Sequence, residues 1–75
     1  MKISELQDKT IINIRDGKNI GTISDLEINE KGEIINFYAI ESKFFLKIFS
    51  RGTETIFKME DIKKIGEDVI LVQID

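Results

Sequence analysis

One stretch of the sequence combines aromatic and basic side chains at close spacing and is the clearest candidate for a binding function. Residues 43–51 contain three of the five Phe, three cations and no acidic residue. The stretch carries a charge of +3, whereas the rest of the chain carries 8 − 14 = −6. Such a segment can grip a protein groove, stack on nucleic acid bases or enter an anionic lipid interface. The alternative is that its apolar residues continue a strand hairpin and pack on the domain itself.

Among the binding interpretations we favour a protein contact, in which the phenylalanines anchor and the cations orient an acidic partner. The acidic face of a second copy of the chain would be one such partner. The predicted partner-binding residues are Lys43, Phe44, Phe45, Lys47, Phe49 and Arg51.

A pair of carboxylates, Asp25 and Glu27, is the second candidate. On a strand, residues two apart project from the same face. Paired carboxylates can bind a hard cation or share acid and base roles. The same spacing occurs on any solvated strand face, and the sequence offers nothing that completes a metal site here. We therefore expect an ordinary exposed face and assign no metal.

The remaining composition excludes several classes of function. His and Cys are both absent, so neither a nucleophile–base pair nor a zinc finger can be built. No glycine-rich phosphate loop is present. We predict no catalytic residue, no cofactor and no enzyme activity. The net charge of −3 argues against a strongly cationic nucleic acid binder, and neither a membrane span nor a secretory signal is recognisable. A cytoplasmic location is the default expectation.

The elements that must position these residues are strands. Sixteen residues are Ile and two are Val, and such β-branched side chains favour a pleated surface over a helix. Gly17 and Gly32 mark turns, and the shift in apolar alternation beside Gly21 predicts a bulge or bend. We expect strands at 9–14, 19–28, 33–41, 53–59, 62–65 and 69–74, a short turn at 3–6 and a helical turn near 59–62. Ile12 and Ile14 would share one strand face.

Together these elements predict one all-β domain over residues 1–75. Its fold would be a small closed or nearly closed antiparallel β-barrel of five to six strands, because closure removes exposed edges. A chain of this length buries only about 60% of its unfolded surface, so its core is thin.

The predicted strand at 33–41 is apolar on both faces. Ile34, Tyr38 and Ile40 lie on one side, and Ile35, Phe37 and Ala39 lie on the other. The barrel interior can cover only one of these sides, so the other side needs a separate cover. A terminal segment or a second copy of the chain could supply that cover, and a symmetric dimer would also relieve the thin core. The predicted self-association residues are Ile35, Phe37 and Ala39.

The order and spacing of these features resemble the PRC-barrel domain. The similarity runs through the stretch 17–28, the turn at Gly32, the strand 34–40 and the closing stretch 60–72. The N-terminal residues 1–6 and the aromatic residues 43–45 resemble the short stand-alone YlmC/YmxH group of spore-forming bacteria. Relatives often carry a Pro followed by an aromatic residue before the helical turn, and residues 57–59 here do not.

The resemblance implies a β-barrel binding module. PRC barrels occur in the H subunit of the photosynthetic reaction centre and in the ribosome-maturation factor RimM, which docks a ribosomal protein. The stand-alone group is associated with sporulation, and no catalytic residue can be carried over from it. We therefore expect a non-enzymatic, sporulation-associated module that binds a protein partner and forms a homodimer. The alternative is a small RNA- or ribosome-associated barrel.

Overall fold

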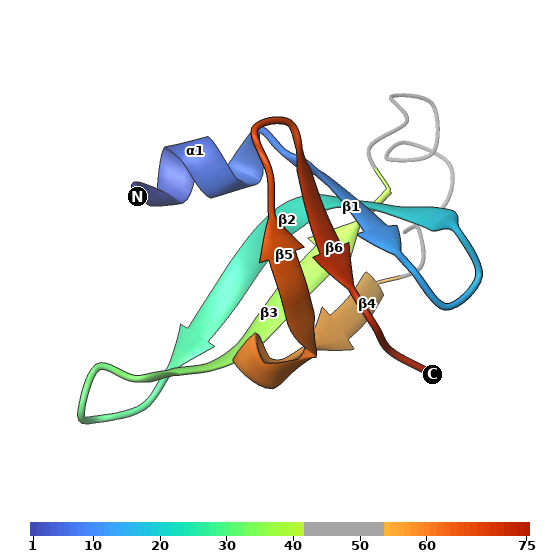
Figure 1. The fold of residues 1–75 in the computed structure, drawn as a ribbon. Coiled ribbons are helices and arrows are strands. Elements are labelled where there is room, and N and C mark those ends of the chain that lie inside the picture. Colours follow the sequence, from blue (N-terminus) through green and yellow to red (C-terminus); the bar gives the residue numbers. More distant parts are fainter. Residues whose placement is uncertain (42–53) are drawn as a thin grey trace, which may run out of the picture.

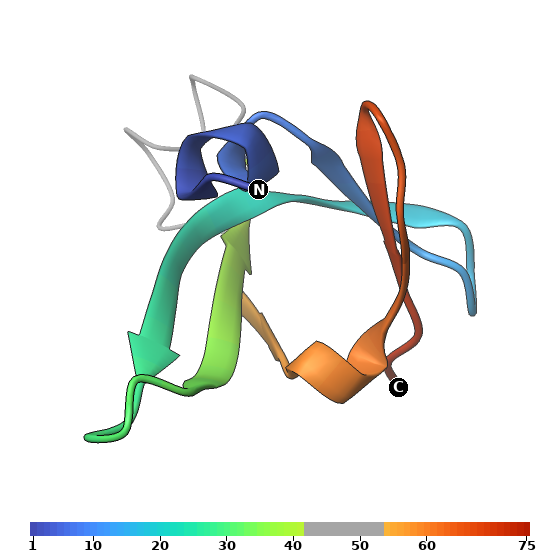
Figure 2. The same ribbon diagram turned by 60° about the vertical axis from the view of Figure 1, so that its left-hand side comes forward.

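The computed structural model describes residues 1–41 and 54–75. In Figure 2 the strands follow one another around an almost complete ring, with the N-terminal α-helix above it. The elements are α1 (Ile3–Gln7), β1 (Thr10–Asn13), β2 (Lys18–Ile28), β3 (Ile34–Ile40), β4 (Glu54–Phe57), the 3-10 turn η1 (Met59–Asp61), β5 (Ile62–Ile65) and β6 (Val69–Val72). The expected small, nearly closed barrel with a helical turn near residues 59–62 is confirmed.

The strands form one six-stranded sheet in the order β4-β3-β2-β1-β6-β5. Its two edge strands, β4 and β5, do not pair, and η1 crosses between them (Figures 1 and 2). The chain does not reverse direction through η1, whereas each hairpin reverses it. As a result β6 returns parallel to β1, with Thr10 opposite Val69. The barrel is therefore antiparallel in four of its five pairings and parallel in the fifth.

The core is a compact apolar cluster inside the curled sheet. The rings of Phe37 and Phe57 stack there with centroids 5.2 Å apart and an angle of 12° between their planes. Such stacking stabilises the pair beyond the effect of burying each ring. Leu6 of α1 packs against the cluster from one side. Its buried members are Ile11, Ile23, Phe37, Ala39, Phe57, Ile70 and Val72.

On β1 the inward face is the opposite of the one suggested by Ile12 and Ile14. Ile11 and Asn13 are buried, whereas Ile14 is 45% exposed. Asn13 can lie inside because both polar atoms of its side chain are hydrogen-bonded. Its amide nitrogen donates to Ile74 O (3.1 Å), and its amide oxygen accepts from Ile74 N (3.3 Å) and Arg15 N (3.2 Å). The side-chain amide of Asn13 thus serves as hydrogen-bond partner for backbone groups of Arg15 and Ile74, which lie just beyond the ends of β1 and β6.

Lys9 is the second buried polar residue among those described. Its ammonium donates to the carbonyl oxygens of Gly66 (2.8 Å) and Glu67 in the turn between β5 and β6. The ammonium thus satisfies carbonyls that the tight turn leaves without ladder partners. It ties the start of β1 to the neighbouring β5–β6 hairpin.

Among the glycines in residues 1–41 and 54–75, Gly21 makes the closest approach to neighbouring backbone. Its φ is +106°, and a Cβ there would overlap the carbonyl group of Ile40 and lie 2.7 Å from the backbone nitrogen of Glu41. The pairing of β1 with β2 shifts register at this point, between Gly21 and Asn19. The bulge or bend predicted beside Gly21 is confirmed, and only glycine fits it without displacement.

The structure relocates part of the predicted self-association surface. Phe37 is 1% exposed and Ala39 is 0% exposed, both inside the chain's own core. The cover that the sequence analysis sought from a second copy is thus supplied by the barrel itself for these two side chains. Ile35 is 39% exposed at the end of the barrel. A contact through β3 must therefore use the opposite, outer face of the strand.

Candidate functional site

The outer surface of strands β2, β3 and β4 gathers polar, acidic and apolar side chains around one tyrosine. Tyr38 on β3 lies between Asp25 on β2 and Ile56 on β4 in the strand register. Directly opposed residues of neighbouring strands project from the same side of a sheet. We call this surface the Tyr38 face, and its residues are Asp25, Glu27, Asn36, Tyr38, Ile40, Glu54 and Ile56.

A bulge in β2 sets which side chains reach this face. The pairing of β2 with β3 skips Ser24, so that Ile23 faces Ala39 and Asp25 faces Tyr38. The hydroxyl of Ser24 donates to Tyr38 O at 3.2 Å. The extra residue inverts the alternation, which leaves Ile23 in the core and turns Asp25 outward. Without the bulge the acidic residues would point into the apolar cluster.

Glu27 is the centre of a hydrogen-bonded group on this face. One of its carboxylate oxygens accepts from the Asn36 amide at 2.9 Å and from the Tyr38 hydroxyl at 3.0 Å. These two bonds hold the pKa of Glu27 below its ordinary value, with Asn36 the larger cause. Bonds to a charged acceptor favour its ionised form. Glu27 therefore keeps its negative charge while it fixes the orientation of the tyrosine ring.

The electrostatic potential at Tyr38 is negative. Its hydrogen bond to Glu27 raises the pKa of the phenol, and partial burial and the charges of Glu27, Glu54 and Asp25 raise it further. Beside these three carboxylates, Ile56 is 54% exposed and Ile40 is half-buried. A surface that joins negative charge to an aromatic ring and aliphatic side chains suits a partner that carries cations among apolar groups.

The alternative reading of the same acids, a metal site, gains no support from the described residues. Asp25 and Glu27 do lie on one face, as their spacing predicts. However, one oxygen of Asp25 accepts from Leu26 N at 2.8 Å, and Glu27 binds Asn36 and Tyr38. Within residues 1–41 and 54–75, no group of three or more potential ligands is placed to hold an ion.

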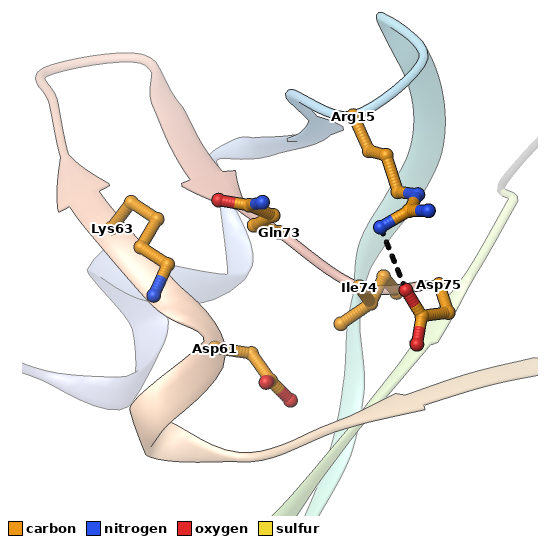
Figure 3. A pocket seen from close by; sticks show the side chains of 6 residues that line it. All are labelled: Arg15, Asp61, Lys63, Gln73, Ile74 and Asp75. Atoms are coloured by element: carbon orange, nitrogen blue, oxygen red, sulfur yellow. Dashed lines mark ion pairs between the residues drawn. The ribbon is translucent and has the colours of Figure 1, made fainter.

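A hollow of about 460 Å³ lies where the segment after β1 meets the segment after β6 (Figure 3). It is lined by charges of both signs. Arg15 pairs with Asp75 at 2.8 Å across it, and both side chains are more than half exposed. Asp61 accepts from Lys58 N at 2.8 Å and so caps η1. The exposed ion pair links the segment after β1 to the last residue, and the mixed charges favour no particular ligand.

A second hollow, of about 520 Å³, lies at the end of the barrel near η1. Ile34, Ile35 and Met59 contribute its apolar lining, and Met59 is 51% exposed. Glu33, Lys58 and Glu60 are among its polar lining residues. Ile35, one of the predicted self-association residues, lies here and not on the Tyr38 face.

The predicted partner-binding residues fall outside the described part of the chain. Lys43, Phe44, Phe45, Lys47, Phe49 and Arg51 all belong to the stretch 42–53, which joins β3 to β4. The Tyr38 face was missed by the sequence analysis, which considered Asp25 and Glu27 but not their tyrosine partner. One feature of the sequence could have indicated this face. Tyr38 shares its strand face with Ile40, and Asp25 and Glu27 occur on the preceding strand, which can pair with it.

Comparison with known proteins gives a consistent picture. A model of the PRC-barrel domain matches residues 1–75. The chain is 37% identical over 75 residues to "Probable sporulation protein YlmC" of Bacillus subtilis, covering 99% of this chain and 93% of the relative. It is 30% identical over 76 residues to "Uncharacterized protein YmxH" of the same organism, covering 99% and 89%. It is also 36% identical over 74 residues to an uncharacterized protein of Clostridium acetobutylicum, covering 97% and 84%.

Proposed function

The chain belongs to the PRC-barrel domain family, and from that premise we propose that it acts as a protein-interaction module and not as an enzyme. In this proposal the module is a single domain over residues 1–75 that works in the cytoplasm and associates with itself. The names of the related proteins that match it mention no reaction.

The observation that carries the proposal is the division of charge within the chain. Residues 43–51 carry +3 and the rest of the chain carries −6. The described surface concentrates part of that negative charge around the half-buried ring of Tyr38 and the exposed side chain of Ile56. Opposite charges combined with apolar anchors are what a specific protein contact uses for orientation and affinity.

A role in sporulation is the second part of the proposal. Its support is the printed name of the relative that is 37% identical over nearly the whole of both chains. A barrel without recognisable catalytic groups fits a part in assembly better than a part in metabolism. Deleting the gene in a spore-forming host and counting heat-resistant spores would test this part separately, with an unchanged count contradicting it.

In the described part of the chain, residues 1–41 and 54–75, no helix is long and apolar enough to cross a membrane.

The mass of the protein in solution tests self-association. Multi-angle light scattering would be applied to the wild type and to the triple variant Phe44→Ser, Phe45→Ser, Phe49→Ser, with circular dichroism to confirm folding. We expect a wild-type dimer and a folded monomeric variant. A wild-type monomer over the accessible concentration range would contradict self-association. A variant that is unfolded would show that these phenylalanines belong to the core and remove them from the proposed contact.

The RNA- or ribosome-associated alternative makes a different prediction. Binding to phosphates falls steeply as salt is added, because counterions are released. A protein contact with an apolar component retains most of its strength. Titration of a fluorescent RNA at low and high salt, with the triple Phe variant beside the wild type, separates the two. Tight, salt-sensitive RNA binding by the wild type would favour the alternative.

A further inference from the structure

We propose that the Tyr38 face is the docking site for residues 43–51 of a second copy of this chain. The inference rests on the proposed self-association and adds where the second copy binds. Under this proposal each chain offers one acidic sheet face and one basic aromatic segment, and two chains exchange these contacts reciprocally.

The chemistry of the two partners is complementary. The face presents Asp25, Glu27 and Glu54 around the ring of Tyr38, and its exposed Ile56 supplies apolar area. The segment presents three cations and three phenylalanines. An arginine or lysine can pair with the carboxylates and lie over the tyrosine ring, while a phenylalanine covers the isoleucines. The fixed ring orientation, held by Glu27, reduces the entropy lost on binding.

The attachment points of the segment place it within reach of a neighbour. Ile40 and Glu54 are paired at one end of the β3–β4 ladder, and residues 42–53 join the two strands from there. A loop whose ends are fixed together can extend about half its contour. For these 12 residues that is about 20 Å at roughly 3.3 Å per residue. This exceeds the strand spacing of a sheet several times.

If a two-fold axis relates the two chains, the assembly is closed, which means that no docking face or segment is left free to bind a third chain. In an isologous dimer, the segment of one chain contacts the face of the other, and the reverse contact is identical. Both acidic faces are then neutralised in part, and the exposed apolar groups of both are covered. The pair therefore stops at two copies and does not grow into a filament.

Two charge-reversed variants test the reciprocal contact. The segment variant carries Lys43→Glu, Lys47→Glu and Arg51→Glu. The face variant carries Asp25→Lys and Glu54→Lys, and retains Glu27 because this side chain orients the tyrosine. Each variant alone places like charges together, so we expect its dimerisation constant to weaken by about 100-fold or more. An equimolar mixture of the two should restore the dimer, because both contacts again join opposite charges.

Matched controls change the same charge elsewhere. Lys18→Glu, Lys31→Glu and Lys64→Glu reverse three exposed cations away from the face. Glu30→Lys and Glu67→Lys reverse two exposed acids in the turns after β2 and after β5. We expect both controls to remain dimers, which separates a local contact from an effect of net charge.

The outcomes distinguish this inference from the proposal on which it rests. If both variants remain dimers, the inference is wrong, while self-association through another surface stands. If both are folded monomers and their mixture is also monomeric, the reciprocal exchange is wrong. A monomeric wild type overturns both statements.

The wild type alone gives a second readout that needs no variant. The chain contains one tyrosine and no tryptophan, so its intrinsic emission reports on Tyr38. We expect that emission to change on dilution together with the mass, and the dimer to weaken as salt screens the contact. A dimer that dissociates with no change at Tyr38 would contradict the inference, even where a variant fails to fold.

Discussion

The substitution Gly21→Ala tests the closest backbone approach in the barrel. At φ +106° an alanine is strained, at a cost of about 1–3 kcal/mol. Its Cβ would also overlap the carbonyl group of Ile40. Relief requires β2 and β3 to separate at the pair Thr22–Ile40, which loses ladder hydrogen bonds worth about 1 kcal/mol each and loosens the core behind them. We expect a total loss of about 4 kcal/mol or more.

Gly17→Ala is the matched control. Gly17 also has a positive φ, +75°, but a Cβ there would meet no atom within 4 Å. Its substitution therefore carries the backbone cost without the overlap, about 1–2 kcal/mol. The difference between the two variants isolates the contact with Ile40.

Urea denaturation followed by circular dichroism measures the difference. A chain of 75 residues has a total stability of about 4–11 kcal/mol and an m-value near 1 kcal/mol/M. Gly17→Ala should lower the midpoint by about 1–2 M, and Gly21→Ala should lower it by about 4 M or more. Midpoints of the two variants within about 0.5 M would refute the argument from the overlap.

Four further predictions concern the site and the core. Glu27→Gln should lower the pKa of Tyr38 toward its ordinary value, which the ultraviolet absorbance of the single tyrosinate measures; an unchanged titration would show that the carboxylate charge is not felt there. Because the folded pKa of Glu27 is depressed, its contribution to stability is present at neutral pH and is lost as pH falls through that folded value. Tyr38→Phe should reduce this loss, as acid titration of the two proteins would show. Phe57→Ala should cost about 3–5 kcal/mol, and a urea midpoint close to that of the wild type would contradict its place in the core. Asn13→Ala should cost about 1–3 kcal/mol and speed hydrogen exchange at Ile74 N, and equal protection would exclude the proposed bond.

The strand pattern and its turns were predictable because they depend on local chemistry. The turns at Gly17 and Gly32 follow from the need for positive φ, which both glycines adopt. The helical turn at Met59–Asp61 follows from the acidic residues at its start. These features need no knowledge of the rest of the chain.

The faces of the strands were not predictable to the same degree. Alternation along β1 gives two faces but does not say which is inside, and an asparagine on the inner face becomes acceptable only once Ile74 lies beside it. The bulge at Ser24 changes the alternation within β2 without a glycine or proline to mark it. The group of Glu27, Asn36 and Tyr38 depends on that bulge and on the register between two strands. Both are tertiary properties, so this part of the candidate site was accessible only from the structure.

The parallel pairing of β1 with β6 joins two strands that are synthesised at different times. Thr10 must find Val69, 69 − 10 = 59 residues later. At a synthesis rate of about 5–20 residues per second, β1 leaves the ribosome about 3–12 s before its partner is available. Ile11 and Asn13 can pair with β2 early, but they lack their β6 neighbours Ile70 and Val72 for all of that interval. The hairpins of β1 with β2 and of β2 with β3 have no such delay, so this part of the barrel can form first, with the outer edge of β1 left unpaired until the last strand arrives.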